Sequence, residues 1–369
     1  MKKVISFFRS DIVFTIALIA AILSVVLTPL SKEYFSYIDF KVLALLMSLM
    51  LIVEGFKSVG TFEVLSHAFL SKVGSIRTAS LTLVVLCFFI AMAVTNDVAL
   101  ITMVPFTMAV MDFCTERRIV FLIVMETVAA NLGSMLTPIG NPQNLYLFSF
   151  YNLEILEFLK ITLPTSLLSL VIIIIVILLV KSRKINIVFD VDVKIEDKKR
   201  FSAYIIAFIF CILTVVGIIP YQISFLATIA IVFISKKELF RCVDYGLLCT
   251  FIFFFIFVGN ISNYDVAANY IQELLVDKEF IIGISASQII SNVPAAVLLS
   301  SFTDNYKDLI LGTNIGGLGT MIASLASLIS WKFYCKRTSA RKCLYFIMFT
   351  GINLGFLFIL IMQCIIFIQ

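Results

Sequence analysis

The apolar segment from residue 120 to 150 contains a run that no continuous helix can accommodate. Asn131–Asn144, with the sequence NLGSMLTPIGNPQN, holds two prolines, two glycines and three asparagines. A proline lacks an N–H and clashes with the preceding helical turn, so a helix must break near Pro138 and Pro142. Irregular backbone at membrane depth is tolerated only where it is buried in protein or lines a wet cavity. The run therefore predicts a cavity at mid-membrane, where a transporter holds its cargo.

A second stretch repeats this pattern. Residues 313–324, TNIGGLGTMIAS, place asparagine, glycine and threonine at the same spacing inside another apolar segment. The alignment pairs Asn131 with Asn314, Gly133 with Gly316, Thr137 with Thr320 and Ile139 with Ile322. Two copies of one unit, related by an axis in the membrane plane, form an architecture that carries alternating access.

The composition places both stretches in a membrane protein. Hydrophobic residues make up 61% and charged residues 14% of the chain, whereas soluble domains are nearer to about half and about a quarter. The single histidine excludes a multi-histidine metal site, and the sequence has no glycine-rich loop for ATP. An intramembrane enzyme would need a catalytic pair that the chain lacks, so we expect no enzyme and no cofactor other than a coupling ion. The basic residues lie in short loops, which argues against a nucleic-acid partner.

The expected fold class is all-α and polytopic, with about nine full spans of about 20 apolar residues each. Two further apolar stretches, 77–113 and 279–303, are interrupted by Thr95-Asn96-Asp97 and by Ser291-Asn292-Val293-Pro294. Each stretch is either one kinked helix or a re-entrant hairpin that enters the membrane halfway and returns.

Basic residues decide between these two interpretations. Lysine and arginine mark cytoplasmic loops, and the hairpin interpretation places 23 of the 28 basic residues on the cytoplasmic side. A full crossing at 77–113 would put Arg117 and Arg118 outside and would invert every later segment. We therefore expect an inner or plasma membrane protein with a cytoplasmic N-terminus. The first hairpin then enters from the cytoplasm and the second from outside.

The chain is expected to divide into two inverted repeats joined by a polar cytoplasmic linker at 181–200. Each repeat combines scaffold spans with one hairpin and one broken span. The first repeat, 1–180, contains the hairpin 77–113 and the broken span 119–150, and the second, 201–369, contains the hairpin 279–303 and the broken span 307–331.

The breaks supply the expected chemistry. N-termini of half-helices favour anions, while C-terminal ends and unwound carbonyls favour Na⁺. Asp97 is costly near the bilayer centre, by roughly 2.5–3.5 kcal/mol on insertion scales, so it binds Na⁺, carries a proton or caps the returning helix. Glu126 also falls inside an apolar span. It belongs to the site, snorkels toward the interface or pairs with a basic loop residue.

At these residues the chain resembles the ion transporter superfamily, which includes sodium-coupled citrate and dicarboxylate symporters and arsenite permeases. The matching segments are TNDVALITMVPF at 95–106, NLGSMLTPIGNPQN at 131–144, SNVPAAVLL at 291–299 and NIGGLGTMIASLAS at 314–327. The resemblance implies an elevator mechanism, in which two hairpins and two broken helices slide against a scaffold that dimerises. By position it also implies two Na⁺ sites, one at Thr95, Asn96 and the Gly133–Thr137 loop and one at Ser287, Ser291, Asn292 and the Gly316–Thr320 loop.

The sequence departs from the dicarboxylate branch of that superfamily. Hairpin tips in that branch carry Ser-Asn-Thr, whereas Asp97 and Val293 stand at the third position here. An acidic tip repels a carboxylate unless a cation or a proton neutralises it. The Asn-Asp pair is closer to the arsenite-permease and sodium/proton-antiporter branches.

The sequence thus predicts a secondary active transporter of a small anion, citrate-like or an inorganic oxyanion, coupled to Na⁺ or H⁺. The alternative is an arsenite or metalloid exporter or a sodium/proton antiporter. The residues expected to bind cargo are Asn96, Asn292, Thr95, Ser291, Asn141 and Thr320. The residues expected at the coupling-ion sites are Asp97, Asn131, Gly133, Thr137, Ser287, Asn314 and Gly316. The expected partners are the anion, the lipid bilayer and a second copy of the chain, which docks through the scaffold spans.

Overall fold

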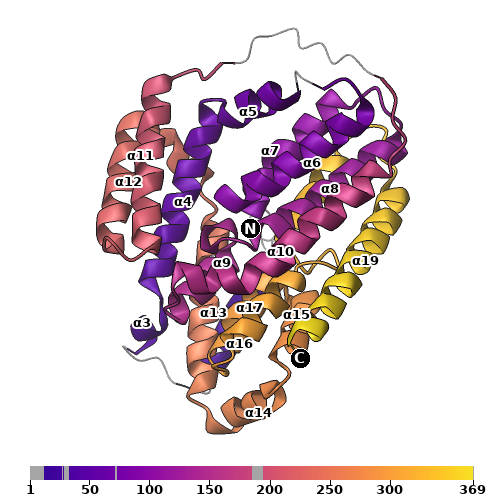
Figure 1. Ribbon diagram of the computed structural model, residues 1–369. Helices are drawn as coiled ribbons and strands as arrows, with labels where there is room; N and C mark the ends of the chain where they lie inside the picture. Colours follow the sequence, from indigo (N-terminus) through magenta and orange to yellow (C-terminus); the bar gives the residue numbers. More distant parts are fainter. Residues whose placement is uncertain (1–11, 27, 29–32, 71–72, 185–193, 369) are drawn as a thin grey trace.

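The protein is built from helices (Figure 1). The computed structural model describes residues 12–26, 28, 33–70, 73–184 and 194–368. The helices before the linker are α2 (Ile12–Ser24), α3 (Tyr34–Tyr37), α4 (Phe40–Ser58), α5 (Thr61–Leu70), α6 (Ile76–Ala93), α7 (Asn96–Val110), α8 (Glu116–Ser134), the 3-10 helix η1 (Pro138–Gly140), α9 (Pro142–Phe150) and α10 (Ile155–Leu178). Those after it are α11 (Lys198–Val215), α12 (Tyr221–Lys236), the 3-10 helix η2 (Lys237–Cys242), α13 (Tyr245–Ser262), α14 (Asp265–Leu275), α15 (Glu279–Ile290), α16 (Asn292–Ser300), α17 (Tyr306–Ile315), α18 (Leu325–Cys335) and α19 (Lys342–Ile368). The expected all-α class is confirmed.

Several helices are apolar enough to lie in a membrane, as expected of a polytopic protein. Within the described residues, α6, α10, α13 and α19 are individually long and apolar enough to cross it. A fifth span results if α4 and α5, which meet at a bend of 58°, count as one. These are fewer than the expected nine or so full spans, because α17, α2 and α12 have only 10, 13 and 16 residues and the 19-residue α8 carries Glu116, Arg117, Arg118 and Glu126.

Both broken segments are interrupted at residues that disfavour a helix, which are prolines and a glycine in the first and glycines in the second. In the first, α8 ends at Ser134 and α9 begins at Pro142, a position that needs no backbone N–H. In the second, α17 ends at Ile315 and α18 begins at Leu325, and Gly319 between them has a φ of 102° that favours glycine. Each break leaves peptide groups that must find partners outside a helix.

The two interrupted stretches each form a pair of contacting helices, α6 with α7 and α15 with α16. Both α6 and α7 pack against α8, and both α15 and α16 pack against α17. In addition, α7 contacts α18 and α16 contacts α9. The α6–α7 pair therefore packs against α8, the first helix of the first broken segment, and against α18, the second helix of the other one. The α15–α16 pair packs against α17 and α9 in the corresponding way.

Two apolar cores flank the breaks. The first core is formed mainly by α6, α7, α8 and α19, and the second by α4, α9, α11, α13 and α16. In Figure 1, α11 and α12 lie beside α4 on one side of the molecule, and α19 lies on the other. Because α8 belongs to the first core and α9 to the second, the first break lies where the chain passes from one core to the other.

The expected linker at 181–200 is described only at its ends. Val180 accepts a hydrogen bond of 2.9 Å from the Arg77 side chain, and Asp197 caps α11 by accepting from the N–H groups of Lys199 and Arg200. Residues 185–193 lie outside the described residues, as do the N-terminal basic residues that indicated a cytoplasmic N-terminus.

Candidate functional site

The tip of the first helix pair is joined to both broken segments through Asn131. Asn96, the first residue of α7, donates from Nδ2 to Oδ1 of Asn131 over 3.0 Å. The hydroxyl of Ser324, at the N-terminus of α18, donates to the same oxygen over 3.0 Å. All three side chains are buried. One asparagine oxygen thus links the tip, the end of α8 and the start of α18.

The tip of the second pair docks on the second break. The N–H of Asn292 donates to the carbonyl of Ala323 over 3.0 Å, and the Ser291 hydroxyl donates to the same carbonyl over 3.4 Å. A Cβ at Gly317 would lie 2.9 Å from Nδ2 of Asn292, so a larger residue here would displace the Asn292 side chain. Since Ala323 adjoins Ser324, both tips meet at the residues that start α18.

A second asparagine pair joins the two breaks directly. Nδ2 of Asn314 donates to Oδ1 of Asn144 over 2.6 Å. The amide nitrogen of Asn144 lies 3.3 to 3.4 Å from the carbonyl oxygens of Ser134, Met135 and Thr137. The Asn144 amide therefore provides a donor to peptide carbonyls that the broken helix leaves without intrahelical partners.

Other residues predicted for the site make hydrogen bonds within the fold. The Thr137 hydroxyl donates to the carbonyl of Met92 over 2.6 Å, and the Ser287 hydroxyl donates to Gly283 within its own helix over 2.7 Å. Thr95 caps α7 by accepting from the N–H of Val98 over 3.4 Å. Asn141 donates weakly to the Ser134 hydroxyl over 3.4 Å. These residues shape the breaks, and their hydrogen bonds do not show a role in binding.

The two predicted glycines fill positions where a side chain has no room. A Cβ at Gly133 would lie 2.3 Å from the carbonyl oxygen of Phe88 in α6. A Cβ at Gly316 would lie 2.8 Å from the Ser287 side chain in α15. Each glycine lets a broken segment lie directly against the first helix of its own pair.

Several buried polar atoms around the breaks have no hydrogen-bond partner. They are Nδ2 of Asn131, Oδ1 of Asn314, and both Oε1 and Nε2 of Gln143. Gln143, which directly follows Pro142 and so could line the cavity or cap the second half of the broken span, is fully buried. An unpaired buried donor or acceptor costs about 1–3 kcal/mol. A polar molecule, a cation or bound water would be stabilised where these atoms point.

Ser291 has a backbone conformation that non-glycine residues rarely adopt. Its φ is 76° and its ψ is 153°, a region used almost only by glycine. Such strain is of order 1–3 kcal/mol and persists where the surrounding structure imposes it, often at functional sites. The strained residue is the one that joins α15 to α16.

Gln288 is a residue at the second break that could not be singled out from the sequence. Its Nε2 donates to the carbonyls of Gly316 and Leu318 over 2.7 and 2.9 Å. Its Oε1 accepts from the N–H of Thr320 over 2.8 Å, and the Thr320 hydroxyl donates to the Gln288 carbonyl over 3.2 Å. The Gln288 side chain thereby bonds to three backbone groups between α17 and α18. The signal in the sequence was a lone amide in the apolar run just before the tip.

Asp97 has no side-chain hydrogen bond to the described asparagines of the network. It lines a cavity of about 130 Å³ between α4, α7 and the start of α13, together with Glu54 and Asp244. Oδ1 of Asp97 is buried and has no hydrogen-bond partner. Within the described part of the chain, no lysine or arginine lines this cavity. Three acidic side chains therefore lie beside the first tip, and one of them, Glu54, forms an ion pair with Lys57 over 3.2 Å.

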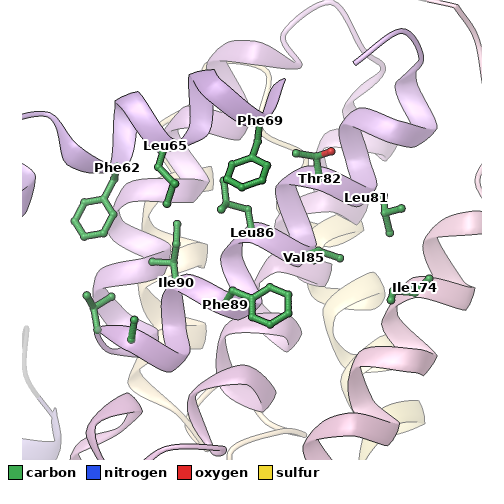
Figure 2. A pocket seen from close by; sticks show the side chains of 12 residues that line it. Phe62, Leu65, Phe69, Leu81, Thr82, Val85, Leu86, Phe89, Ile90 and Ile174 are labelled. Atoms are coloured by element: carbon green, nitrogen blue, oxygen red, sulfur yellow. The ribbon is translucent and has the colours of Figure 1, made fainter. Parts of the chain in front are cut away.

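The most voluminous described cavity lies elsewhere and has different chemistry. It measures about 720 Å³ and lies between α5 and α6, with Ile174 of α10 at its edge (Figure 2). Phe62, Leu65 and Phe69 form one wall, and among the described residues that line the cavity Thr82 has the only polar side chain. The described lining of this apolar groove carries no charged side chain, so the polar cluster at the breaks fits a charged cargo better.

Comparison with known proteins shows what this chain is similar to. A family model described as "Citrate transporter" matches residues 2–306. The uncharacterized transporter MJ0456 of Methanocaldococcus jannaschii is 33% identical over 300 residues, which cover 81% of this chain and 82% of the relative. The inner membrane protein YbiR of Escherichia coli is 26% identical over 306 residues, 81% of each chain. The silicon efflux transporter LSI3 of Oryza sativa is 30% identical over 155 residues, 41% of this chain and 31% of the relative.

Proposed function

The chain belongs to the citrate transporter family, and on that premise we propose that it is a secondary active transporter of a small anion, driven by Na⁺ or H⁺. It is a multi-pass membrane transporter and not an enzyme. The cargo, citrate-like or an inorganic oxyanion, and the coupling ion belong to the proposal. So do the inner or plasma membrane location, the cytoplasmic N-terminus and the homodimer through scaffold spans.

The observation that carries the proposal is the meeting of four helix breaks at one buried polar cluster. Asn96 and Ser324 both donate hydrogen bonds to Oδ1 of Asn131, and Asn314 donates to Asn144. The unpaired amide atoms of Asn131, Gln143 and Asn314 lie among these residues. Converging half-helices with free polar groups can hold an anion and its coupling cation together. Neutral amides do so without the cost of a buried charge.

An elevator mechanism with two inverted repeats is part of the proposal. It is supported by the matching contacts of the α6–α7 and α15–α16 pairs. It is also supported by two cavities at opposite ends of α4 and α13. One is the cavity beside Asp97, and the other, of about 340 Å³, is lined by Asp39, Tyr146 and the last turn of α13. Movement of the polar cluster along these helices would expose it first to one cavity and then to the other.

Ligand-dependent stability of the purified protein tests the function. Thermal unfolding is measured in Na⁺ and in K⁺, each with and without citrate, succinate, phosphate, sulfate or arsenite. A ligand at a hundredfold its Kd stabilises the folded state by about 2.7 kcal/mol. We expect one anion to stabilise the protein in Na⁺, or in acidic buffer if H⁺ is the coupling ion. If no anion stabilises it in either condition, the anion proposal fails.

Transport by two variants tests the site. Asn96→Ala and Asn292→Ala should each abolish uptake into proteoliposomes while the folded protein remains in the membrane. Asn353→Ala is the matched control, because Asn353 is a buried asparagine of α19 that bonds only to Phe349 of its own helix in the described contacts. Wild-type uptake by both tip variants would place the cargo elsewhere.

A metalloid exporter or a sodium/proton antiporter is the second candidate. The acidic side chains Asp97 and Asp244 in this cavity favour it, because an ionised carboxylate there would repel a citrate-like anion but not a cation or an uncharged metalloid hydroxide. The similarity to a silicon efflux transporter points the same way. Stabilisation by arsenite without Na⁺, or stability that follows pH and requires Asp97, would put this candidate first.

A further inference from the structure

Glu126 is a fully buried acid in the middle of α8. Its Oε1 accepts a hydrogen bond from the hydroxyl of Thr107 on α7. Its Oε2 is buried and has no hydrogen-bond partner. Among the described residues it forms no ion pair. The carboxyl group bridges α8 to the second helix of the first pair, and it makes no hydrogen bond to the described asparagines at the breaks.

The groups that face Glu126 carry no positive charge. From α6, the Cys87 thiol donates to the backbone carbonyl of Glu126 over 3.5 Å. From α19, Tyr345 is the other described titratable side chain that interacts electrostatically with Glu126. On the adjacent turn, Thr127 bonds to Ser330 of α18 over 2.8 Å. No lysine, arginine or histidine of the described helices packed against α8 reaches ion-pair distance of this carboxyl.

These surroundings decide the state of the carboxyl group. An ionised carboxylate removed from water without a partner is so costly that such a group normally becomes neutral instead. One hydroxyl donor does not offset that cost. A bound metal ion would need several oxygen ligands, and the described residues hold no group of three acidic, histidine or cysteine side chains suited to a metal. A proton neutralises the carboxyl group without any further ligand.

We propose that Glu126 is a proton-binding site, which holds one proton between α7 and α8 in the folded protein. Exchange of this proton with water requires α7 to separate from α8, so proton binding is linked to the position of the first helix pair. The consequence for transport rests on the proposed function, whereas the proton site itself does not. Glu126 is thus a proton site separate from Asp97, which lines the cavity beside the first tip.

Thermal unfolding of the full chain in detergent, between about pH 5 and pH 9 in K⁺ buffer, tests the site. The unfolded chain releases this proton above the ordinary glutamate pKa of about 4.3, whereas the folded protein keeps it. Wild-type stability should therefore fall as the pH rises, with the unfolding constant growing by up to about tenfold per pH unit from this group. Glu126→Gln should remove that contribution. Glu63→Gln, at an exposed acid of α5, should keep it.

An infrared spectrum gives an independent readout. The wild type should show the carbonyl band of a protonated carboxylic acid at neutral pH, and Glu126→Gln should lose it. If Glu126→Gln does not fold, Glu126→Leu serves the same comparison. An unchanged pH dependence in these variants would overturn the proposal, as would a stability gain from Na⁺ that depends on Glu126. Neither readout needs cargo, so a failure of the proposed transport function would appear separately, as absent uptake by the wild type.

Discussion

Single residues at the tips show how the backbone is used to build the cluster. Ser291 stands where glycine would be relaxed, and its strained conformation aims the N–H of Asn292 at the carbonyl of Ala323. At the first tip, Asn96 begins α7 with an unstrained cap at Thr95, and its side chain reaches Asn131. The two tips thus reach the same region by different local means.

Ser291→Gly should raise stability while weakening function. Glycine relieves a strain of about 1–3 kcal/mol but removes the hydroxyl that bonds to Ala323. We expect a higher melting temperature and lower cargo affinity, measured by thermal unfolding and by ligand titration. Ser291→Ala, which loses the hydroxyl and keeps the strain, should lower affinity without the gain in stability. A glycine variant no more stable than the alanine variant would show that Ser291 is not strained.

At the scale of elements, close contact between a broken helix and the first helix of its pair keeps the breaks in register. Gly133 lets α8 lie directly against the backbone of Phe88 in α6. Gly312 does the same for α17, since a Cβ there would lie 2.5 Å from the carbonyl oxygen of Phe280 in α15. Both pairs therefore depend on small residues rather than on large apolar side chains at their closest approach.

Gly133→Ala should destabilise the protein, because the added methyl group meets backbone that cannot turn aside. Forced overpacking costs about 1–3 kcal/mol, which thermal unfolding in detergent can measure. Gly351→Ala in α19 is the matched control, since no atom lies within 4 Å of its added Cβ. There the change should be neutral or stabilising by roughly 0.5–1 kcal/mol. Equal effects at both positions would contradict the close contact of α6 and α8.

At the scale of the whole molecule, an ion-pair cluster joins the two halves at the start of α8. Arg337, between α18 and α19, bonds to Glu116 over 2.8 Å and to Asp112 over 2.6 Å. Partial burial alone would raise the pKa of Glu116, but hydrogen bonds from Ser339, Arg337 and Tyr334 outweigh it and lower the pKa. The Glu116 carboxylate in turn raises the pKa of Arg337.

Arg337→Gln should lower stability at neutral pH by about 1.5–3 kcal/mol, the size of a hydrogen bond to a charged group. Because the pKa of Glu116 is lowered in the folded state, its contribution is full above the ordinary value of about 4.3 and is lost as the pH falls through the lowered value. The difference between variant and wild type should therefore shrink in acid, as thermal unfolding at several pH values would show. Lys332→Gln, at an exposed lysine of α18, should have little effect at any pH. A difference that does not change with pH would rule out Glu116 as its source.

Much of the fold could be predicted because its signals are local. A proline removes a backbone donor wherever it stands, so the break before Pro142 followed from the sequence alone. The all-α class followed from long apolar runs, and the tips at Asn96 and Ser291 followed from polar residues inside them. The number of spans did not follow, because length and hydropathy do not distinguish a short helix that crosses the membrane from one that returns.

Partners in space could not be predicted in the same way. Asn314 pairs with Asn144, and Gln288 bonds across the second break. Glu126 has Thr107, on another helix, as its side-chain partner. Each of these contacts joins residues that are far apart in the chain or lie on different helices. The sequence alone determined where helices must stop, because backbone geometry is a property of each residue and its neighbours. Only the tertiary structure decided which polar groups meet and which are left without a partner, because that depends on how the helices pack and exclude water.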